Sequence, residues 1–277
     1  MYIKTILKEN RFALIKIYLY LTTYQILTLA GPFALGKAID GLLKHEWRWL
    51  VVFFALEFIA NVFMYKRMVF DTFVYTRIYN DIVLRYLSNN RESDTSTKSA
   101  RTDLANLIIH FFEDAIPYYI MSVITIIGSA AYICWQDWQT GLIVIGCLIP
   151  VVFLVLHFYP RIDLVTRLAN SHYEKKVQSL SSVSDEVQRN FFNRRGKLQI
   201  YRSTLQGKSW FSLNNTKTTF LVGALVIFTY NKAGLTQGEA IAMFSYINQF
   251  LISLMSIPVA MEIWSMVRDV TKRLNSE

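Results

Sequence analysis

Polar side chains interrupt several apolar segments of this sequence. They are Gln25, Glu57, Asn61, Ser245, Asn248, Gln249, Ser253 and Glu262. Polar groups are costly in a lipid bilayer, so inside a membrane segment they are candidates for binding a solute or an ion. Ser245, Gln249 and Ser253 recur at every fourth position, which places them on one face of a helix. Together these side chains predict a polar cavity within a membrane.

Glu57 is the most informative of these residues. A lone carboxylate is unstable in hydrocarbon, so it must be protonated or paired. No basic residue of another apolar segment stands clearly at the same depth. Glu57 is therefore a candidate for binding a substrate or a proton. The Gln, Ser and Asn side chains have a second interpretation, which the residues alone favour: hydrogen bonds between helices, worth about 1 kcal/mol each.

The elements that must position these side chains are long apolar segments. The chain is 53% hydrophobic and its mean hydropathy is +0.29, well above an ordinary soluble domain. Crossing about 30 Å of hydrocarbon takes about 20 apolar residues. The predicted fold is an all-α membrane protein with six transmembrane helices, at Phe12–Leu35, Trp49–Met68, Ala115–Trp135, Gly141–Pro160, Trp210–Tyr230 and Ala240–Trp264.

Short and long connections alternate between these segments. The short ones are Lys44–Arg48, Gln136–Thr140 and Asn231–Gly238, and the long ones are 66–114 and 161–208. Lys and Arg concentrate beside the long connections, so the positive-inside rule places these and both termini in the cytoplasm. We expect a multi-pass protein of the plasma (inner) membrane. The net charge of +9 then reflects topology, and no nucleic-acid partner is expected.

Both long connections are predicted to be cytoplasmic helical hairpins. The second segment continues as an apolar stripe, and its helix from Trp49 to Leu87 spans about 60 Å. The fourth segment continues after Pro160 in the same way. The hairpin tips are expected near Ser88–Asp103 and Asn190–Lys208. The second tip carries aromatic and basic residues that could bind a partner protein or anionic lipid headgroups, namely Phe191, Phe192, Arg194, Arg195, Tyr201 and Arg202.

Several local motifs share one family resemblance. Residues 31–40 read Gly-Pro-Phe-Ala-Leu-Gly-Lys-Ala-Ile-Asp, and residues 234–238 read Gly-Leu-Thr-Gln-Gly before the sixth segment. Pro258 lies within that segment, and residues 267–274 read Val-Arg-Asp-Val-Thr-Lys-Arg-Leu. With six spans, short outer loops and long inner helices, the whole chain resembles the transmembrane domain of an ATP-binding-cassette (ABC) exporter.

The resemblance implies a transporter that works as a homodimer. A separate ATPase subunit would bind the cytoplasmic tips, and its ATP-driven closure would switch the cavity between inward and outward access. In that interpretation the chain is a single six-span domain over residues 1–277, not itself an enzyme, and ATP acts only through the partner. No cofactor or metal is expected in the chain, because its four His and two Cys show no ligand spacing.

The sequence also departs from the family pattern. We expect no nucleotide-binding domain, because Gly207-Lys208-Ser209 lacks the earlier glycine of a P-loop, and position 202 is Arg. The first tip is rich in Ser and Thr and lacks the family's aromatic docking stretch. Two alternatives therefore remain. One is a proton-coupled or passive transporter with Glu57 as the titrating group, and the other is a membrane interaction protein that does not transport.

Overall fold

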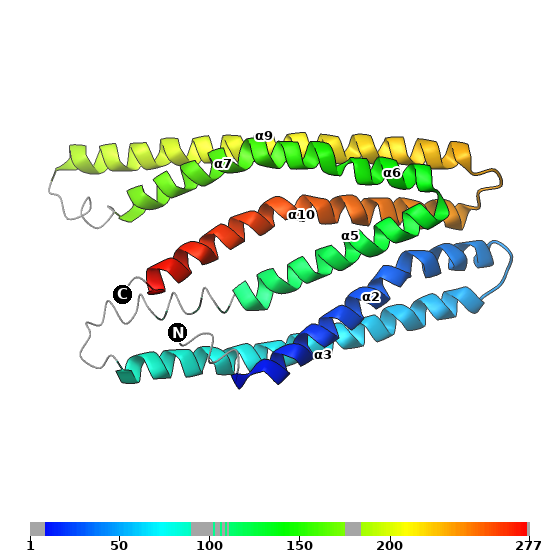
Figure 1. The fold of residues 1–277 in the computed structure, drawn as a ribbon, viewed down its shortest axis with the longest axis horizontal. Coiled ribbons are helices and arrows are strands. Elements are labelled where there is room, and N and C mark those ends of the chain that lie inside the picture. Colours follow the sequence, from blue (N-terminus) through cyan, green and yellow to red (C-terminus); the bar gives the residue numbers. More distant parts are fainter. Residues whose placement is uncertain are drawn as a thin grey trace. The chain divides into compact units, whose positions relative to one another are not determined.

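The protein is built from long helices (Figure 1). The computed structural model describes residues 9–89, 102, 106, 109, 111–174 and 184–275, with the side chains of the last helix described as far as Ser256. Within these ranges every element is helical, which confirms the predicted all-α class. The elements are α2 (Arg11–Leu42), α3 (Arg48–Asn89), the π-helix η1 (Phe111–Ala115), α5 (Ile116–Gln136), α6 (Trp138–Gly146), α7 (Leu148–Glu174), α9 (Asp185–Asn231) and α10 (Gln237–Asn275).

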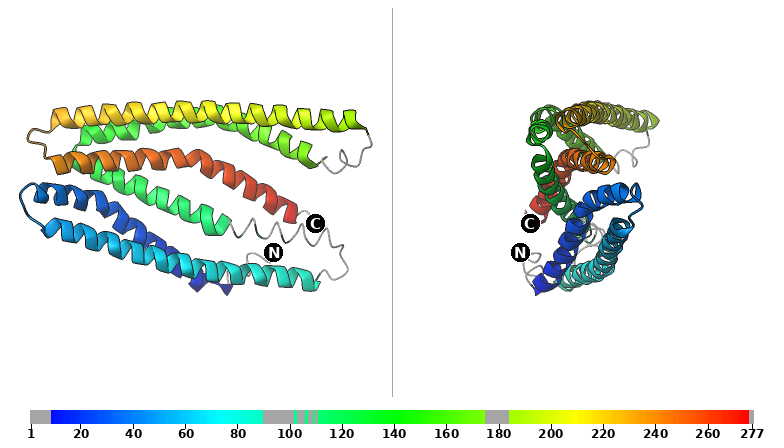
Figure 2. Two further views of the ribbon diagram at one scale, coloured as in Figure 1. Left: turned by 180° about the vertical axis from the view of Figure 1, so that it is seen from behind. Right: turned by 90° about the vertical axis from the view of Figure 1, so that its right-hand side faces the viewer.

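The chain divides into two compact units. Residues 1–141 and 224–277 form unit 1, and residues 142–223 form unit 2. Inside unit 1, α2 packs against α3, α5 and α10, and α10 also packs against α5. Figures 1 and 2 show α2 and α3 running antiparallel, joined by a short turn. The α10 helix buries one apolar face in this unit through Met243, Ile247, Phe250, Leu251 and Leu254.

The predicted continuation of the second segment into a long helix is confirmed. The α3 helix runs unbroken for 42 residues, which is about 63 Å. Its apolar stripe packs as predicted on other helices, because Val74, Tyr75 and Ile78 form a buried cluster with Ile17 and Ile109. The tip predicted at Ser88–Asp103 begins where α3 ends, and most of it lies outside the described residues.

The fourth predicted segment contains a break. The α6 helix ends at Gly146 and α7 begins at Leu148, while the amide of Cys147 is shared between the carbonyls of Ile143 and Val144, both at 3.2 Å. Pro150 explains the position of the break, because it has no N–H to donate to the carbonyl of Gly146 four residues earlier. Pro160 lies inside α7 without ending it, as predicted.

The predicted second tip is wrong. Residues 190–208 lie in the first half of α9, an unbroken helix of 47 residues, and α7 ends earlier, at Glu174. Asp185 and Glu186 occupy the first turn of α9, where negative charge favours a helix start. Gly196 and Gly207 stay helical even though glycine costs about 1 kcal/mol relative to alanine in a helix.

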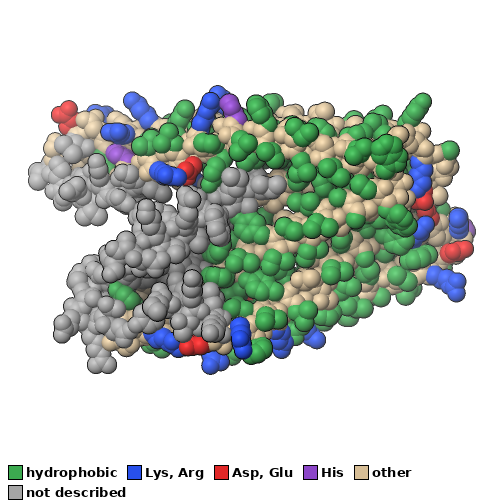
Figure 3. All heavy atoms as spheres, viewed as in Figure 1, with side chains coloured by type: hydrophobic (Ala, Val, Ile, Leu, Met, Phe, Trp, Pro, Cys, Tyr) green, Lys and Arg blue, Asp and Glu red, His purple; other side chains and the backbone are tan. Residues whose placement is uncertain are grey.

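Four helices are long and apolar enough to cross a membrane: Arg11–Leu42, Arg48–Ser88, Phe111–Gln136 and Trp138–Ala169. They contain the first four predicted spans. Within the part of the chain that the structure describes, α9 and α10, which contain the fifth and sixth predicted spans, are not among these four. In α9, Asn214, Asn215, Thr218 and Thr219 each bond a carbonyl four residues earlier, so polar side chains are accommodated by the helix itself. Figure 3 shows hydrophobic side chains covering the helices along their lengths, with charged side chains toward their ends.

Candidate functional site

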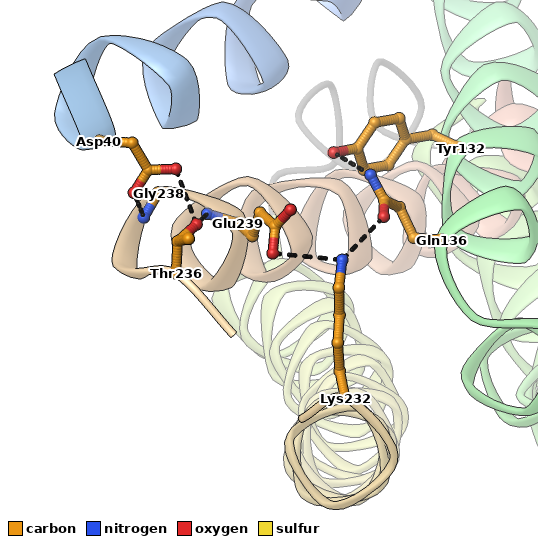
Figure 4. A network of polar contacts seen from close by, with 7 residues as sticks. All are labelled: Asp40, Tyr132, Gln136, Lys232, Thr236, Gly238 and Glu239. Carbon is orange, nitrogen blue, oxygen red and sulfur yellow. Dashed lines mark hydrogen bonds and ion pairs between the residues drawn. The ribbon is translucent and has the colours of Figure 1, made fainter. Parts of the chain in front are cut away.

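Two motifs far apart in the sequence meet where α10 begins (Figure 4). The hydroxyl of Thr236 donates to Oδ2 of Asp40 at 2.7 Å, and the amide of Gly238 donates to Oδ1 of Asp40 at 2.9 Å. Thr236 also accepts the amide of Glu239 at 3.2 Å and so caps the start of α10. A single carboxylate at the end of α2 therefore fixes the first turn of α10. We call Asp40, Thr236, Gly238 and Gly36 the short-loop clasp.

The backbones of α2 and α10 are in direct contact at the clasp. A Cβ atom placed on Gly36 would lie 2.5 Å from the carbonyl oxygen of Gly238, and one placed on Gly238 would overlap the carbonyl oxygen of Gly36. Only glycine at both positions lets the two helices approach this closely. The side chain of Asp40 can bond the amide of Gly238 because of this approach.

A second polar network lies beside the clasp (Figure 4). Lys232 pairs with Glu239 at 3.2 Å and donates to the side-chain oxygen of Gln136 at 3.1 Å. Gln136 in turn donates to the hydroxyl of Tyr132 at 3.1 Å. A small open pocket between these groups and the clasp has room for about one water molecule, which is too little for an organic solute.

Asp137 joins the start of α6 to the end of α9. Its carboxylate accepts the hydroxyl of Thr140, the amide of Thr140 at 3.0 Å and the side-chain amide of Asn231 at 3.2 Å. Partial desolvation acts to raise the pKa of this carboxyl, but the hydrogen bonds from Thr140 and Asn231 outweigh it and lower the pKa below the usual 3.8. Asp137 is thus held as a charged helix cap near neutral pH.

In the described structure no hydrogen bond or ion pair joins the predicted cavity residues to one another, and their shared cavity stays a prediction. Gln25 is buried in unit 1 and donates to the hydroxyl of Thr125 on α5 at 2.7 Å. The hydroxyl of Thr125 in turn donates a hydrogen bond to the carbonyl of Met121 at 2.8 Å. The other side-chain oxygen of Gln25 is buried without a hydrogen bond in the described structure. Gln25 therefore links α2 to α5, as the cross-linking interpretation expects.

The polar residues of α10 are spread along the helix. The hydroxyl of Ser245 bonds the carbonyl of Ile241 in its own helix at 2.8 Å. Asn248, Gln249 and Ser253 are half-buried. Ser256 of α10 does make a hydrogen bond to another helix, because its hydroxyl lies 3.0 Å from that of Ser122 on α5. The side chain of Glu262 lies outside the described residues, and cavity lining by α10 stays a prediction.

Glu57 lies against α2. Its side chain is half-buried, and a Cβ atom on Gly31 would come within 2.9 Å of its Oε1 oxygen. The missing side chain of Gly31 thus leaves room for this carboxyl group. Glu57 forms no hydrogen bond or ion pair with any residue that the structure describes. Asn61, one turn further on, has an exposed side chain, so the two residues share a helix face but not an environment.

The predicted docking residues lie on the first turns of α9, in unit 2. Phe191 is buried and stacks on His172 of α7 at 4.3 Å, while Nε2 of the same histidine lies 3.0 Å from the carbonyl of Phe191. Phe191 therefore holds α9 to α7. Arg202 is half-buried, and the remaining residues are exposed, namely Phe192, Arg194, Arg195 and Tyr201. Docking through these residues stays a prediction.

Sequence reasoning missed the residues that join the helices. Asp40, Gly36 and Gly238 were quoted as motif residues, but their contact was not predicted. A local signal was present, because Thr236-Gln-Gly-Glu239 has the Thr-x-x-Glu spacing of a helix start. Ser256 and Thr125 gave no such signal, since isolated hydroxyls are common in apolar helices.

Among the described residues no group of His, Cys, Asp or Glu could hold a metal ion. The strongest independent evidence on function comes from comparison with known families. The sequence matches none of the curated proteins. Residues 3–238 match a family described as the ABC transporter transmembrane region. This match covers the four apolar helices and both motifs of the clasp. The protein is a multi-pass membrane protein, and the chain belongs to the family of ABC transporter transmembrane regions.

Proposed function

We propose that this chain is the membrane subunit of an ABC exporter that moves a solute by alternating access. The family match over residues 3–238 is the observation that carries the proposal. The long helices support it, since α3 and α9 extend about 63 and 70 Å, roughly twice the thickness of the hydrocarbon layer. In the proposed orientation the excess length of these helices stands in the cytoplasm, and both termini lie on that side.

The proposed energy source is a partner ATPase. Closure of the ATPase would move the cytoplasmic ends of the long helices and so open and close the cavity on opposite sides. The exposed residues Phe192, Arg194, Arg195 and Tyr201 on α9 supply a charged and aromatic surface for that partner. The chain itself would bind no ATP and would assemble as a homodimer.

Affinity capture of the tagged full chain from its native membrane tests this proposal. We expect an ATPase to copurify and to hydrolyse ATP after reconstitution with the chain. The double substitution R194Q/R195Q should weaken capture about tenfold or more if the α9 surface is the docking site. The matched control is Arg48→Gln with Lys44→Gln, which removes two exposed charges at the short-loop end. Equal capture by all variants would exclude this docking surface, and the absence of any ATPase would overturn the proposed energy source.

A second candidate function rests on Glu57. Its half-buried carboxyl group lies against α2 within an apolar helix and has no ion-pair partner among the described residues. Such a group suits proton coupling, in which transport is driven by a pH gradient without ATP. Uptake of a panel of fluorescent solutes into proteoliposomes under a pH gradient separates this function from the first. Glu57→Gln should abolish the gradient dependence, and unchanged uptake would exclude the proton role.

A further inference from the structure

The start of α5 contains an irregular turn that the proposed function does not explain. The π-helix η1, Phe111–Ala115, leads directly into α5, and Pro117 is the second residue of that helix. A π-helix pairs each carbonyl with the amide five residues later, whereas an α-helix pairs it with the amide four residues later. Proline has no N–H. Any carbonyl that would bond residue 117 in either register is therefore left without a backbone donor.

Two carbonyls are affected in this way. Glu113 precedes Pro117 by four residues, so its carbonyl would bond residue 117 in the α register. Phe112 precedes Pro117 by five residues, so its carbonyl would bond residue 117 in the π register. A buried carbonyl without a donor is strongly unfavourable, so each of these two needs a donor from elsewhere in the register that would pair it with residue 117.

Side chains of α3 supply both missing donors. Nη2 of Arg67 donates to the carbonyl of Glu113 at 3.3 Å. The hydroxyl of Tyr75 donates to the carbonyl of Phe112 at 3.0 Å. Both donors are buried, at 8% and 1% exposure. The two carbonyls that Pro117 leaves without an amide are thus the two that α3 binds.

Arg67 is held in place by a carboxylate one turn further along α3. Its Nε lies 3.2 Å from Oδ2 of Asp71, and Asp71 is itself only 4% exposed. A buried guanidinium is tolerated when it is paired and hydrogen-bonded. Asp71 therefore holds the side chain of Arg67 toward η1, where the bond from a guanidinium to a carbonyl is stronger than that from a neutral donor.

The two contacts belong to different registers. In the α register the amide of Ile116 can bond the carbonyl of Phe112, so Tyr75 is released and the carbonyl of Glu113 needs Arg67. In the π register the amide of Tyr118 can bond the carbonyl of Glu113, so Arg67 is released and the carbonyl of Phe112 needs Tyr75. Each side chain thus supports one register.

We propose that η1 is a pivot of α5 with two backbone registers, in which Tyr75 supports the π register and Arg67 supports the α register. This deepens the proposed function and rests on it, because alternating access needs helices that can change direction at defined points. Arg67 and Tyr75 are positioning residues in this scheme, since they act through the backbone of η1.

Hydrogen exchange of the full chain in nanodiscs tests the pivot. The informative amides are those of residues 112–120. Tyr75→Phe should change exchange in this segment several-fold, and outside it only near Tyr18 of α2, whose hydroxyl also bonds that of Tyr75. The double variant R67Q/D71N should accelerate exchange there about tenfold, since the carbonyl of Glu113 loses its partner while no lone carboxylate remains buried. The control R85Q removes an exposed arginine of the same helix, paired with Glu9, and should leave the segment unchanged.

Pro117→Ala provides the decisive comparison. Alanine restores the N–H of residue 117, which can then bond the carbonyl of Glu113 directly. In the P117A background R67Q/D71N should therefore accelerate exchange by no more than about twofold. The same acceleration in both backgrounds would overturn the pivot, as would unchanged exchange in R67Q/D71N. If the charge-removing variants do not fold, Tyr75→Phe with and without P117A decides the same question.

The role in transport needs a second measurement. In the reconstituted complex with its ATPase, P117A should lower ATP turnover several-fold while capture of the ATPase stays unchanged. Unchanged turnover would exclude the pivot from the transport cycle. If no ATPase copurifies, the proposed function fails on its own, and the exchange experiment still decides whether η1 changes register.

Discussion

The short-loop clasp and the η1 turn join helices within the same unit by opposite means. At the clasp, α2 and α10 meet backbone to backbone, with Gly36 and Gly238 in contact and Asp40 bonding an amide. At η1, α3 reaches the backbone of the neighbouring turn only through the side chains of Arg67 and Tyr75. In the proposed scheme the backbone contact between the glycines is the fixed end of this unit, and η1, whose side-chain donors can exchange partners, is the movable end.

The largest effect is expected from Gly238→Ala. The new Cβ would overlap the carbonyl oxygen of Gly36, so α2 and α10 must separate. We expect a loss of about 3 kcal/mol or more in the free energy of unfolding, measured as a fall in the unfolding temperature in detergent. Gly207→Ala is the matched control, because a Cβ there meets nothing within 4 Å, and it should stabilise its helix slightly. A normal unfolding temperature for G238A would show that the clasp is not a fixed contact.

Asp40→Ala should have the next largest effect. It removes the charged acceptor for Thr236 and for the amide of Gly238, and we expect a loss of about 2 kcal/mol in the free energy of unfolding. Asp40→Asn keeps one oxygen acceptor and should lose about half as much. Thermal unfolding of the two variants measures the difference. Equal losses would mean that one neutral acceptor oxygen cannot replace the carboxylate in the clasp.

A smaller loss of stability is expected when the hydrogen bond between Gln25 of α2 and Thr125 of α5 is removed. Gln25→Leu removes the hydrogen bond to Thr125 and should cost about 1 kcal/mol, because hydrogen bonds between membrane helices are individually weak. The double variant Q25L/T125V should cost no more than Q25L alone, since both changes remove the same bond. Additive losses would indicate that Gln25 has another partner, and would revive its interpretation as a cavity residue.

The smallest effect concerns pH at the short-loop end. The pKa of Asp137 is lower in the folded protein than its usual value of 3.8, so unfolding takes up a proton at acid pH. The stability that this carboxylate contributes is complete above the usual pKa and is lost as pH falls through the lowered value. Unfolding temperatures measured between pH 5 and about pH 3 should therefore fall less in Asp137→Asn than in the wild type. Identical pH profiles would remove Asp137 from the fixed end.

The long helices could be predicted from sequence because their signals are local. The stripe through Val74 and Ile78 repeats every four residues and meets no proline, so the course of α3 followed directly. The hairpin tip placed at 190–208 was wrong, because this stretch lies inside one continuous helix. Its glycines, Gly196 and Gly207, each lower helix stability by only about 1 kcal/mol, which a helix of 47 residues tolerates.

The contacts between helices could not be predicted in the same way. Asp40 and Gly238 lie 198 positions apart, and Arg67 and Glu113 lie 46 apart. No local pattern records which side chain will replace the amide that Pro117 lacks. The polar residues of the apolar segments were recognised as unusual, but their neighbours were not predicted. Gln25 bonds Thr125 of α5, whereas Glu57 lies beside Gly31 of α2, and both neighbours depend on how α2 packs.

The paired glycines of the clasp have an evolutionary consequence. The obstacle to any larger residue at Gly36 or Gly238 is a backbone oxygen of the other helix, which every amino acid carries. A clash with a side chain can be relieved by a second substitution that makes the side chain smaller, but a clash with the backbone cannot. Neither position can therefore drift while the other compensates. Descendants of this chain must either keep both glycines or lose the contact altogether.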